Sequence, residues 1–264
     1  MTTTIKNVLD QLMEPVQKIE ITVDALEYGH EETLVKGIAT TFMATNDVIQ
    51  QARDLGVNLL ITHEGMYYSH HDKKDRWLND PVYLEKKGLV EKSNMAIFRF
   101  HDYFHSYKPD GIMTGLLHSL SWETYIEKDQ INASILSLPG MSLGEMAEYV
   151  KSKLNISYVR VVGDLSLMCE RVGVLVGYRG GGENAIPLYN QEQLDLIISG
   201  EGPEWETPEY VRDAVQQGRK KALIVLGHAE SEKSGMKYLA KQIQSIYPNI
   251  PVHFIDENPV FQVV

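Results

Sequence analysis

Cysteine is almost missing from this sequence, since Cys169 is the only one among 264 residues. A single cysteine cannot form a disulfide within the chain, and it cannot supply the thiolate cluster of many structural zinc sites. We therefore expect a protein of a reducing compartment, in which a metal site would use histidine and carboxylate ligands. Cys169 has no base near it in the sequence and is expected to be a buried small hydrophobic residue.

Long apolar runs are also missing. Hydrophobic residues make up 43% of the chain, yet no run of 18 apolar residues occurs, so we expect a soluble globular protein without a membrane span. The first residues lack the basic and apolar segments of a secretory signal. Together with the cysteine content, this predicts a cytoplasmic location.

Basic residues are outnumbered, with 25 Lys and Arg against 36 Asp and Glu and a formal net charge of −11. General nucleic-acid binding needs a basic surface, so this composition argues against it. A small nucleotide or phosphate ester remains a possible ligand if metal ions supply the positive charge.

A β-α-β unit is the clearest structural pattern. Residues 35–43 read as a strand, Asn46 as the N-cap of a helix, and Gly56 as its end. Within residues 58–62, an apolar run bounded by Asn58 and Thr62 is then expected to form a buried strand that leads into His63-Glu64. Because a helical crossover joins parallel strands, the pair is expected at the carboxyl edge of a parallel sheet.

The remaining pattern predicts an α/β fold with a mixed, largely parallel sheet flanked by helices. Further helices are expected at 4–13, 81–92, 112–120, 143–154, 207–217 and 236–243, and further strands at 19–26, 95–100, 157–163, 171–177, 194–199, 222–226 and 252–255. Ser142 and Glu145 form a capping box before one helix. We expect a main domain at 1–125 and 191–264, interrupted by a smaller α+β insertion at 126–190.

Three predicted strands of the main sheet end in metal-binding residue types: His63-Glu64, His101 to His105, and His228 to Glu232. In open α/β sheets, ligands bind beyond the carboxyl ends of the strands. Imidazole and carboxylate without thiolate suit zinc, manganese or iron. The number of such groups exceeds the three protein ligands of a mononuclear catalytic zinc site, so a pair of ions, bridged by Glu232, is the economical interpretation. The competing interpretation is that these are ordinary polar residues in loops.

The order of these segments resembles the Nif-three-like family of dinuclear-metal proteins, some members of which carry the name GTP cyclohydrolase type 2. The likeness covers nearly the whole chain. It rests on Ile61-Thr62-His63, His101-x-x-x-His105, Ile198-Ser199-Gly200-Glu201 and Gly227-His228-x-x-Ser231-Glu232, the last being the most specific. The resemblance implies two divalent metal ions held by His63, Glu64, His105, His228 and Glu232, with His101 adjacent. It also implies a toroidal homohexamer.

The sequence departs from the family pattern at two ligand positions. Members usually have a second histidine where this chain has Glu64, and an aspartate where it has His105. Both replacements keep a metal-binding side chain, which supports a retained site with an altered ligand set. The early Asp-Asn-x-Gly-Leu segment of the family is poorly matched by residues 23–29, so contacts with a substrate are expected to differ there.

The leading hypothesis is a metal-dependent hydrolase acting on a nucleotide or phosphate ester, with His101 or Glu201 as the proton-transfer residue. The alternative is a non-catalytic metal-binding oligomer with a regulatory or assembly role, because fold and ligands do not establish chemistry.

Two further segments carry residues of interest. Ser69-His70-His71-Asp72 reads as a solvated loop, or as a lid that offers a proton-transfer histidine. The glycine-rich stretch 177–182 lacks the GxGxxG spacing, and no clear helix is predicted after it, so it is a weak candidate for a phosphate-binding loop.

Overall fold

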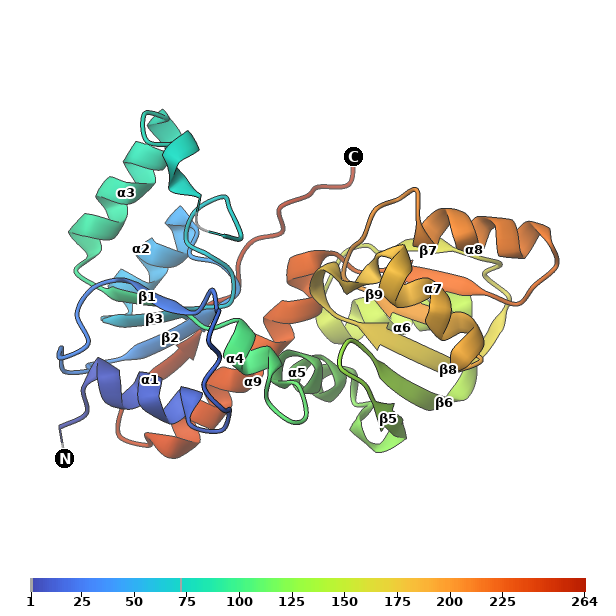
Figure 1. The fold of residues 1–264 in the computed structure, drawn as a ribbon, viewed down its shortest axis with the longest axis horizontal. Coiled ribbons are helices and arrows are strands. Elements are labelled where there is room, and N and C mark those ends of the chain that lie inside the picture. The colour runs from blue at the N-terminus through green and yellow to red at the C-terminus, as the bar shows by residue number, and fades with distance from the viewer. Residues whose placement is uncertain (1, 72) are drawn as a thin grey trace. The chain divides into compact units, whose positions relative to one another are not determined.

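The computed structural model describes residues 2–71 and 73–264 (Figure 1). The chain forms two compact units. The first unit contains the chain up to Gly111 together with Met236–Gln262, and the second contains Ile112–Gly235. The first unit is therefore built from both ends of the sequence.

The sheet of the first unit has five strands in the order β1-β4-β3-β2-β11. They are β1 (Ala25–Tyr28), β4 (Ala96–Arg99), β3 (Leu59–Thr62), β2 (Ile38–Thr41) and β11 (Val252–Phe254). Strands β4, β3, β2 and β11 are parallel, and β1 runs antiparallel at the edge. Thr62 of β3 is in register with Arg99 of β4, so the residues that follow these two strands leave the sheet at the same edge.

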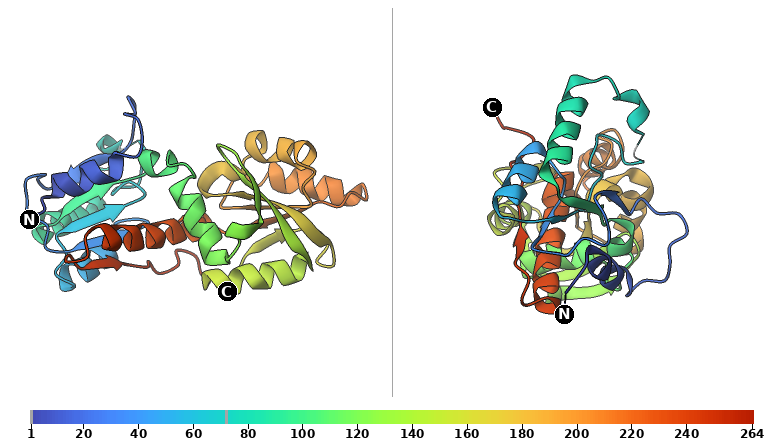
Figure 2. Two further views of the ribbon diagram at one scale, coloured as in Figure 1. Left: turned by 90° about the horizontal axis from the view of Figure 1, so that it is seen from below. Right: turned by 90° about the vertical axis from the view of Figure 1, so that its left-hand side faces the viewer.

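The helices of the first unit are α1 (Ile5–Met13), α2 (Asn46–Asp54), α3 (Pro81–Ser93), the short α4 (Asp102–His105) and the later part of α9 (His228–Ile246). Helices α2 and α3 cover one face of the sheet, and α1 and α9 cover the other (Figures 1 and 2). The apolar face of α2 packs on Leu60 and Ile97 in one buried cluster. The N-cap of α2 is Thr45, whose side chain accepts from the Val48 amide, and not Asn46 as predicted.

The sheet of the second unit has six strands in the order β5-β6-β8-β9-β10-β7. They are β5 (Ile126–Asp129), β6 (Ser134–Ser142), β8 (Met168–Leu175), β9 (Leu196–Ser199), β10 (Ala222–Val225) and β7 (Arg160–Val162). Strands β8, β9 and β10 are parallel neighbours and the others are antiparallel. The segments after β9 and β10 therefore also share one sheet edge.

The helices of the second unit are α5 (Gly111–Leu120), α6 (Leu143–Leu154), α7 (Gly182–Gln191), α8 (Thr207–Gln216) and the start of α9. The predicted capping box of Ser142 and Glu145 is present at the start of α6. Within the part of the chain that the structure describes, no helix is both long and apolar enough to cross a membrane.

The mixed α/β class is confirmed, but two strands were predicted to belong to the wrong sheet. The predicted strands at 194–199 and 222–226 form β9 and β10, which pair with β8 and β7 in the second sheet and not with β2–β4. Strands β5 and β6 were not predicted. A buried apolar run reports that a strand is covered on both faces, but it does not report which strands pair with it. The extent of the inserted domain, residues 126–190, stays a prediction.

Candidate metal centre

His63 is held at the carboxyl end of β3. Its backbone amide donates to the carbonyl oxygens of Thr41 and Phe42, which follows the parallel pairing of β2 and β3. Its side chain is fully buried. The ring Nδ1 lies 3.3 Å from the carbonyl oxygen of Phe100, just beyond the neighbouring strand β4. The imidazole is therefore oriented by the adjacent strand.

His101 and His105 are carried by the short helix α4. A helix of this length needs outside support, because its first amides have no partner within it. Asp24 provides that support: its Oδ1 accepts from the amides of His101 and Asp102 at 2.8 Å, and its Oδ2 accepts from the amide of Tyr103 at 2.9 Å. The spacing of four residues places both imidazoles on one face of the turn.

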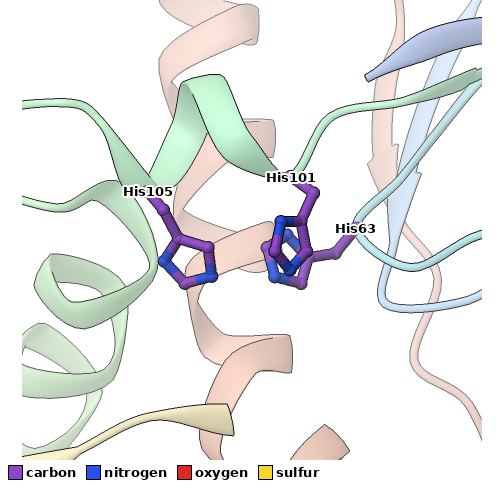
Figure 3. Close-up of side chains that lie close together, drawn as sticks. All are labelled: His63, His101 and His105. Carbon is purple, nitrogen blue, oxygen red and sulfur yellow. The ribbon is translucent and has the colours of Figure 1, made fainter. Parts of the chain in front are cut away.

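These three imidazoles form a compact group, which we call the first donor set (Figure 3). The ring centroids of His63 and His101 are 4.5 Å apart in a stacked arrangement. His105 lies edge-on to both, at 5.0 Å from His63 and 4.9 Å from His101. One ligand atom from each residue lies within 4.8 Å of the others. The first donor set is thus close enough to serve one metal ion.

Each ring of the first donor set has an oxygen acceptor beside its Nδ1. The Nδ1 of His63 faces the carbonyl of Phe100. The Nδ1 of His101 lies 2.8 Å from Asp102 Oδ1, and that of His105 lies 2.9 Å from Asp110 Oδ2. An acceptor at Nδ1 favours the neutral tautomer that carries its proton there, which leaves the Nε2 lone pair for a metal.

The charge state of His101 agrees with this geometry. Burial, together with the neighbouring His63 and His105, lowers the pKa of His101 to about 4, although Asp102 and Glu64 act in the opposite direction. His101 is therefore neutral at pH 7. A neutral His101 within a cluster of oriented imidazoles fits a divalent ion such as zinc, iron or manganese.

Glu64 lies next to this group and pairs with a buried arginine. Its side chain is 17% exposed, and its Oε2 accepts from Arg99 Nη2 at 2.7 Å. Its other oxygen, Oε1, lies 3.8 Å from His101 Nε2. Glu64, His101 and His70 also bring one ligand atom each within 4.8 Å of one another.

In the second unit, His228 and Glu232 form what we call the second donor set. His228 begins α9 after the two residues that follow β10, and Glu232 lies one turn later on the same face. His228 Nε2 and Glu232 Oε2 are 3.1 Å apart, and Glu232 is 2% exposed. On the other side of the ring, His228 Nδ1 lies 2.9 Å from Glu201 Oε1. Glu201 follows β9, so two adjacent parallel strands again supply one cluster.

The turn after β8 leaves room for these side chains because it contains a glycine. Gly177 adopts a φ of +57°, and a Cβ there would overlap Glu232 Oε1. Its amide donates to Ser231 Oγ at 2.9 Å, and that hydroxyl donates to the carbonyl of His228 at 2.8 Å. The serine of the His-x-x-Ser-Glu motif therefore fixes the first turn of α9.

The protonation of His228 differs from that of His101. Burial opposes its positive charge, but hydrogen bonds and charges from Glu232 and Glu201 outweigh burial and raise the pKa of His228 to about 9. In the metal-free chain, the second donor set is therefore an imidazolium-carboxylate ion pair at pH 7.

The predicted site residues fall into the two units as follows. His63, Glu64, His101 and His105 come together in the first unit, and Glu201, His228 and Glu232 come together in the second. The sequence did not reveal Asp24, Asp110 or Arg99 as neighbours of the first donor set, and it indicated His70 only as part of a solvated loop or a lid. Asp24 falls in the predicted strand 19–26, but β1 begins only at Ala25 and Asp24 caps α4 instead.

Two other candidates do not form sites in the structure. A helix, α7, does follow the glycine-rich stretch, contrary to the prediction, but its N-terminal amide at Gly182 already donates to Glu206 Oε2 at 2.6 Å. Cys169 is buried as expected, and burial together with Asp195 raises the pKa of its thiol to about 12. A thiol in this state is not a nucleophile at neutral pH.

Comparison with known proteins gives relatives along the whole chain. A protein named GTP cyclohydrolase 1 type 2 homolog from Clostridium perfringens is 23% identical over 216 residues, which covers 78% of this chain and 77% of the relative. A protein of the same name from Chlamydia trachomatis is 22% identical over 256 residues and covers 96% and 97% of the two chains.

Solved structures share the fold at low identity. A Bacillus cereus protein related to NIF3 matches with a TM-score of 0.77 and 16% identity, over 99% of each chain. Reduced HcgD from Methanocaldococcus jannaschii matches with a TM-score of 0.70 and 18% identity, over 97% of this chain and 99% of that one.

The family model for Duf34/NIF3 (NGG1p interacting factor 3) matches residues 1–259. The match agrees with the resemblance carried by the His-x-x-Ser-Glu segment and by the histidines after β3 and β4. This chain belongs to the Duf34/NIF3 family.

Proposed function

We propose that this protein is a hydrolase that depends on two divalent metal ions and acts on a nucleotide or a phosphate ester. In this proposal the ions, zinc, iron or manganese, are held by His63, Glu64, His105, His228 and Glu232. The carrying observation is the first donor set: three imidazoles within ligand distance of one another, each with an acceptor behind its Nδ1.

The burial of these histidines favours a metal site over the competing interpretation of ordinary polar residues in loops. Three solvated histidines would gain nothing from close packing, and burying them removes their rings from water. Here one ring is fully buried and the other two are mostly buried, with side-chain exposures of 16% for His101 and 12% for His105. A bound cation accounts for both their burial and their shared orientation.

We propose different roles for the two residues predicted to transfer protons. A pKa of about 4 makes His101 a weak base at neutral pH, so we assign it to the ligand group as an additional nitrogen donor. Glu201 is 42% exposed and holds His228 by one oxygen. Its carboxylate is accessible to water, and we propose it as the group that accepts the proton during hydrolysis.

When bound, the ions supply Lewis acidity, which polarises a phosphoryl or carbonyl oxygen and makes water a better nucleophile near pH 7. The chain itself orients the donors through Asp102, Asp110, Glu201 and the Phe100 carbonyl. A chain with a net charge of −11 needs such cations to bind a phosphate. The name of the relatives, GTP cyclohydrolase 1 type 2 homolog, is the reason to include a purine nucleotide among the substrates.

The test is a substrate screen with the full chain loaded separately with zinc, manganese and iron. Phosphate release from mono- and diesters and opening of the purine ring of GTP are followed by absorbance. Turnover that is lost in Glu201→Gln and kept in His118→Ala, a change at an exposed histidine, supports the proposal. Full metal occupancy without turnover on any substrate contradicts it and favours the non-catalytic metal-binding alternative.

We also propose that the protein works as a homo-oligomer, a hexamer, in the reducing cytoplasm. The support for the hexamer is the family resemblance alone. Sedimentation equilibrium of the full chain tests it: a mass near 29.9 kDa, that of one chain, contradicts an oligomer.

A further inference from the structure

A buried arginine connects Glu64 to His70. The side chain of Arg99 is only 1% exposed, and its guanidinium contacts both residues. Nη1 donates to the carbonyl oxygen of His70 at 2.6 Å, while Nη2 lies 2.7 Å from Glu64 Oε2 and 3.0 Å from His70 Nδ1. Arg99 therefore holds His70 by its backbone and by its ring.

The segment leading to His70 is fixed at a second place. Lys86 is 3% exposed, and its ammonium donates to the carbonyl of Met66 at 2.5 Å. The amide of Met66 donates to Glu27 Oε2 at 3.0 Å. Two buried cations thus anchor residues 66–70, and this segment includes Ser69 and His70 of the predicted solvated loop or lid. The Asp72 of that predicted lid lies outside the described residues.

Distance alone would make His70 a metal ligand, since it forms a donor group with Glu64 and His101. The hydrogen bond to Arg99 argues otherwise. Arginine stays protonated and can only donate, so His70 Nδ1 must be the acceptor. A neutral imidazole that accepts at Nδ1 carries its proton on Nε2. With Nδ1 engaged and Nε2 protonated, His70 has no lone pair for an ion. This is the opposite tautomer to that of His101 and His105.

His70 also faces a cavity. An open cavity of about 720 Å³ in the first unit is lined by His70, His71 and Arg99 together with Asp102, Glu27 and Thr22, among others. Asp102 is the acceptor behind His101 Nδ1, so the cavity adjoins the first donor set. The carboxylates of Asp102 and Glu27 oppose a bound oxyanion there, whereas the Arg99 guanidinium and any nearby metal ions favour it.

We propose that Arg99 holds His70 in its Nε2–H tautomer and that this N–H donates a hydrogen bond to a bound ligand. The acceptor is an oxygen of a phosphate group that binds beside the metal ions. The identity of the ligand rests on the proposed function, whereas the tautomer of His70 is assigned independently of it. Arg99 is a positioning residue that acts through His70.

The tautomer is measured on the metal-free full chain, labelled with ¹⁵N-histidine, at pH 8, from the ring nitrogen shifts. We expect the Nε2–H form for His70 in the wild type and in Glu64→Gln, which keeps the contact with Arg99. In Arg99→Met we expect a change towards the Nδ1–H form, since Nδ1 then has Glu64 Oε2 at 3.5 Å as its acceptor. If Arg99→Met does not fold, the ring nitrogen shifts of His70 in the wild type and in Glu64→Gln test the assignment. An Nδ1–H form in the wild type overturns the proposal.

The ligand role is tested with inorganic phosphate, titrated into metal-loaded full chain. His70→Asn keeps an acceptor for Arg99 but lacks the distal N–H, and we expect phosphate to bind about tenfold more weakly, the effect of one hydrogen bond. His70→Gln places an amide N–H near the Nε2 position and is expected to recover most of the affinity. Both variants should keep the wild-type metal content.

Phosphate affinity unchanged in His70→Asn, no phosphate binding to the loaded wild type, or loss of metal in His70→Asn each overturns the donor role. The proposed function fails in a different way, through absence of metal or of turnover in the wild type. The tautomer measurement is independent of both.

Discussion

The two donor sets place their histidines in different electrostatic surroundings. In the first, His63, His101 and His105 face one another, and burial, with a smaller contribution from the other two imidazoles, keeps His101 neutral. In the second, His228 lies between Glu201 and Glu232, which raise its pKa to about 9 and make it an imidazolium at neutral pH. The difference shows that the partners of a histidine, and not its burial alone, decide whether it is ready to bind a metal.

The two sets are also constructed differently. The first donor set depends on a fully buried ring after β3 and on a four-residue helix that Asp24 caps from outside. The second is one turn of the 19-residue helix α9, for which Gly177 leaves space. We therefore expect the first set to be sensitive to distant changes and the second to changes in its immediate surroundings.

The largest effect is expected from removing a ligand of the first donor set. His105→Ala should reduce the affinity for zinc or manganese by about 100-fold or more, because loss of a residue that merely supports a ligand already costs 10–100-fold. Competition with a fluorescent chelator measures the affinity. His118→Ala, which removes an exposed imidazole bound to Glu123, is the matched control and should bind metal like the wild type. Equal metal affinity of His105→Ala and His118→Ala would show that the first donor set does not bind the metal.

The two donor sets also differ in how exposed to solvent the carboxylates are that orient their histidines. Asp110 is 13% exposed and orients His105, whereas Glu201 is 42% exposed and orients His228. Asp110→Ala should weaken metal binding by about 10- to 100-fold, since water cannot easily replace a buried acceptor. Glu201→Ala should cost about tenfold or less because solvent can reach His228 Nδ1. The same chelator competition ranks the two variants, and a larger loss in Glu201→Ala would reverse the comparison.

Proton release on metal binding tests the two charge states directly. With a pKa of about 9, His228 carries a proton at pH 7 that a metal must displace, whereas His101, with a pKa of about 4, has none to lose at its Nε2. Binding should release about one proton at pH 7, and affinity should rise about tenfold per pH unit from pH 7 until the pKa of His228 is reached. Calorimetry in buffers of different ionisation enthalpy measures the release. His228→Ala should abolish it, and release that persists in this variant would contradict the assignment.

The smallest effect concerns the glycine beside Glu232. Gly177→Ala and Gly56→Ala both place a side chain at positive φ, +57° and +72°, which costs about 1–2 kcal/mol of folding stability in each case. Only at Gly177 would the new Cβ also overlap Glu232, since nothing lies within 4 Å at Gly56. Urea unfolding should show the greater loss in Gly177→Ala, together with weaker metal binding. Equal stability and equal metal binding of the two variants would mean that Glu232 moves away from the new Cβ without loss of folding free energy.

Local patterns predicted much of the fold. The capping box of Ser142 and Glu145, the proline start of α3 and the parallel pair β2-β3 all follow from short-range sequence signals. The sheet to which β9 and β10 belong did not, because strand partners depend on contacts far apart in the sequence. Helix α7 was missed because its glycine-rich start and internal Pro187 resemble a loop.

The donor residues were predictable, but their supports were not. His63 and His228 follow apolar runs and match family positions, and His105 takes the place of the usual aspartate, so the sequence marks all three as candidate ligands. Asp24 supports α4 from 77 residues earlier in the chain, and Arg99 reads as one more polar residue in a strand. No spacing rule connects such residues to a site, because the fold alone brings them together.

The most direct test of the central claim is the metal content of the wild-type chain. Purified protein is incubated with zinc, manganese or ferrous iron, desalted, and analysed by plasma emission spectroscopy beside the double variant His105→Ala/His228→Ala. The account predicts about two ions per wild-type chain and close to none in the double variant. A wild-type chain that retains no ion, or a double variant that retains as many as the wild type, would contradict it.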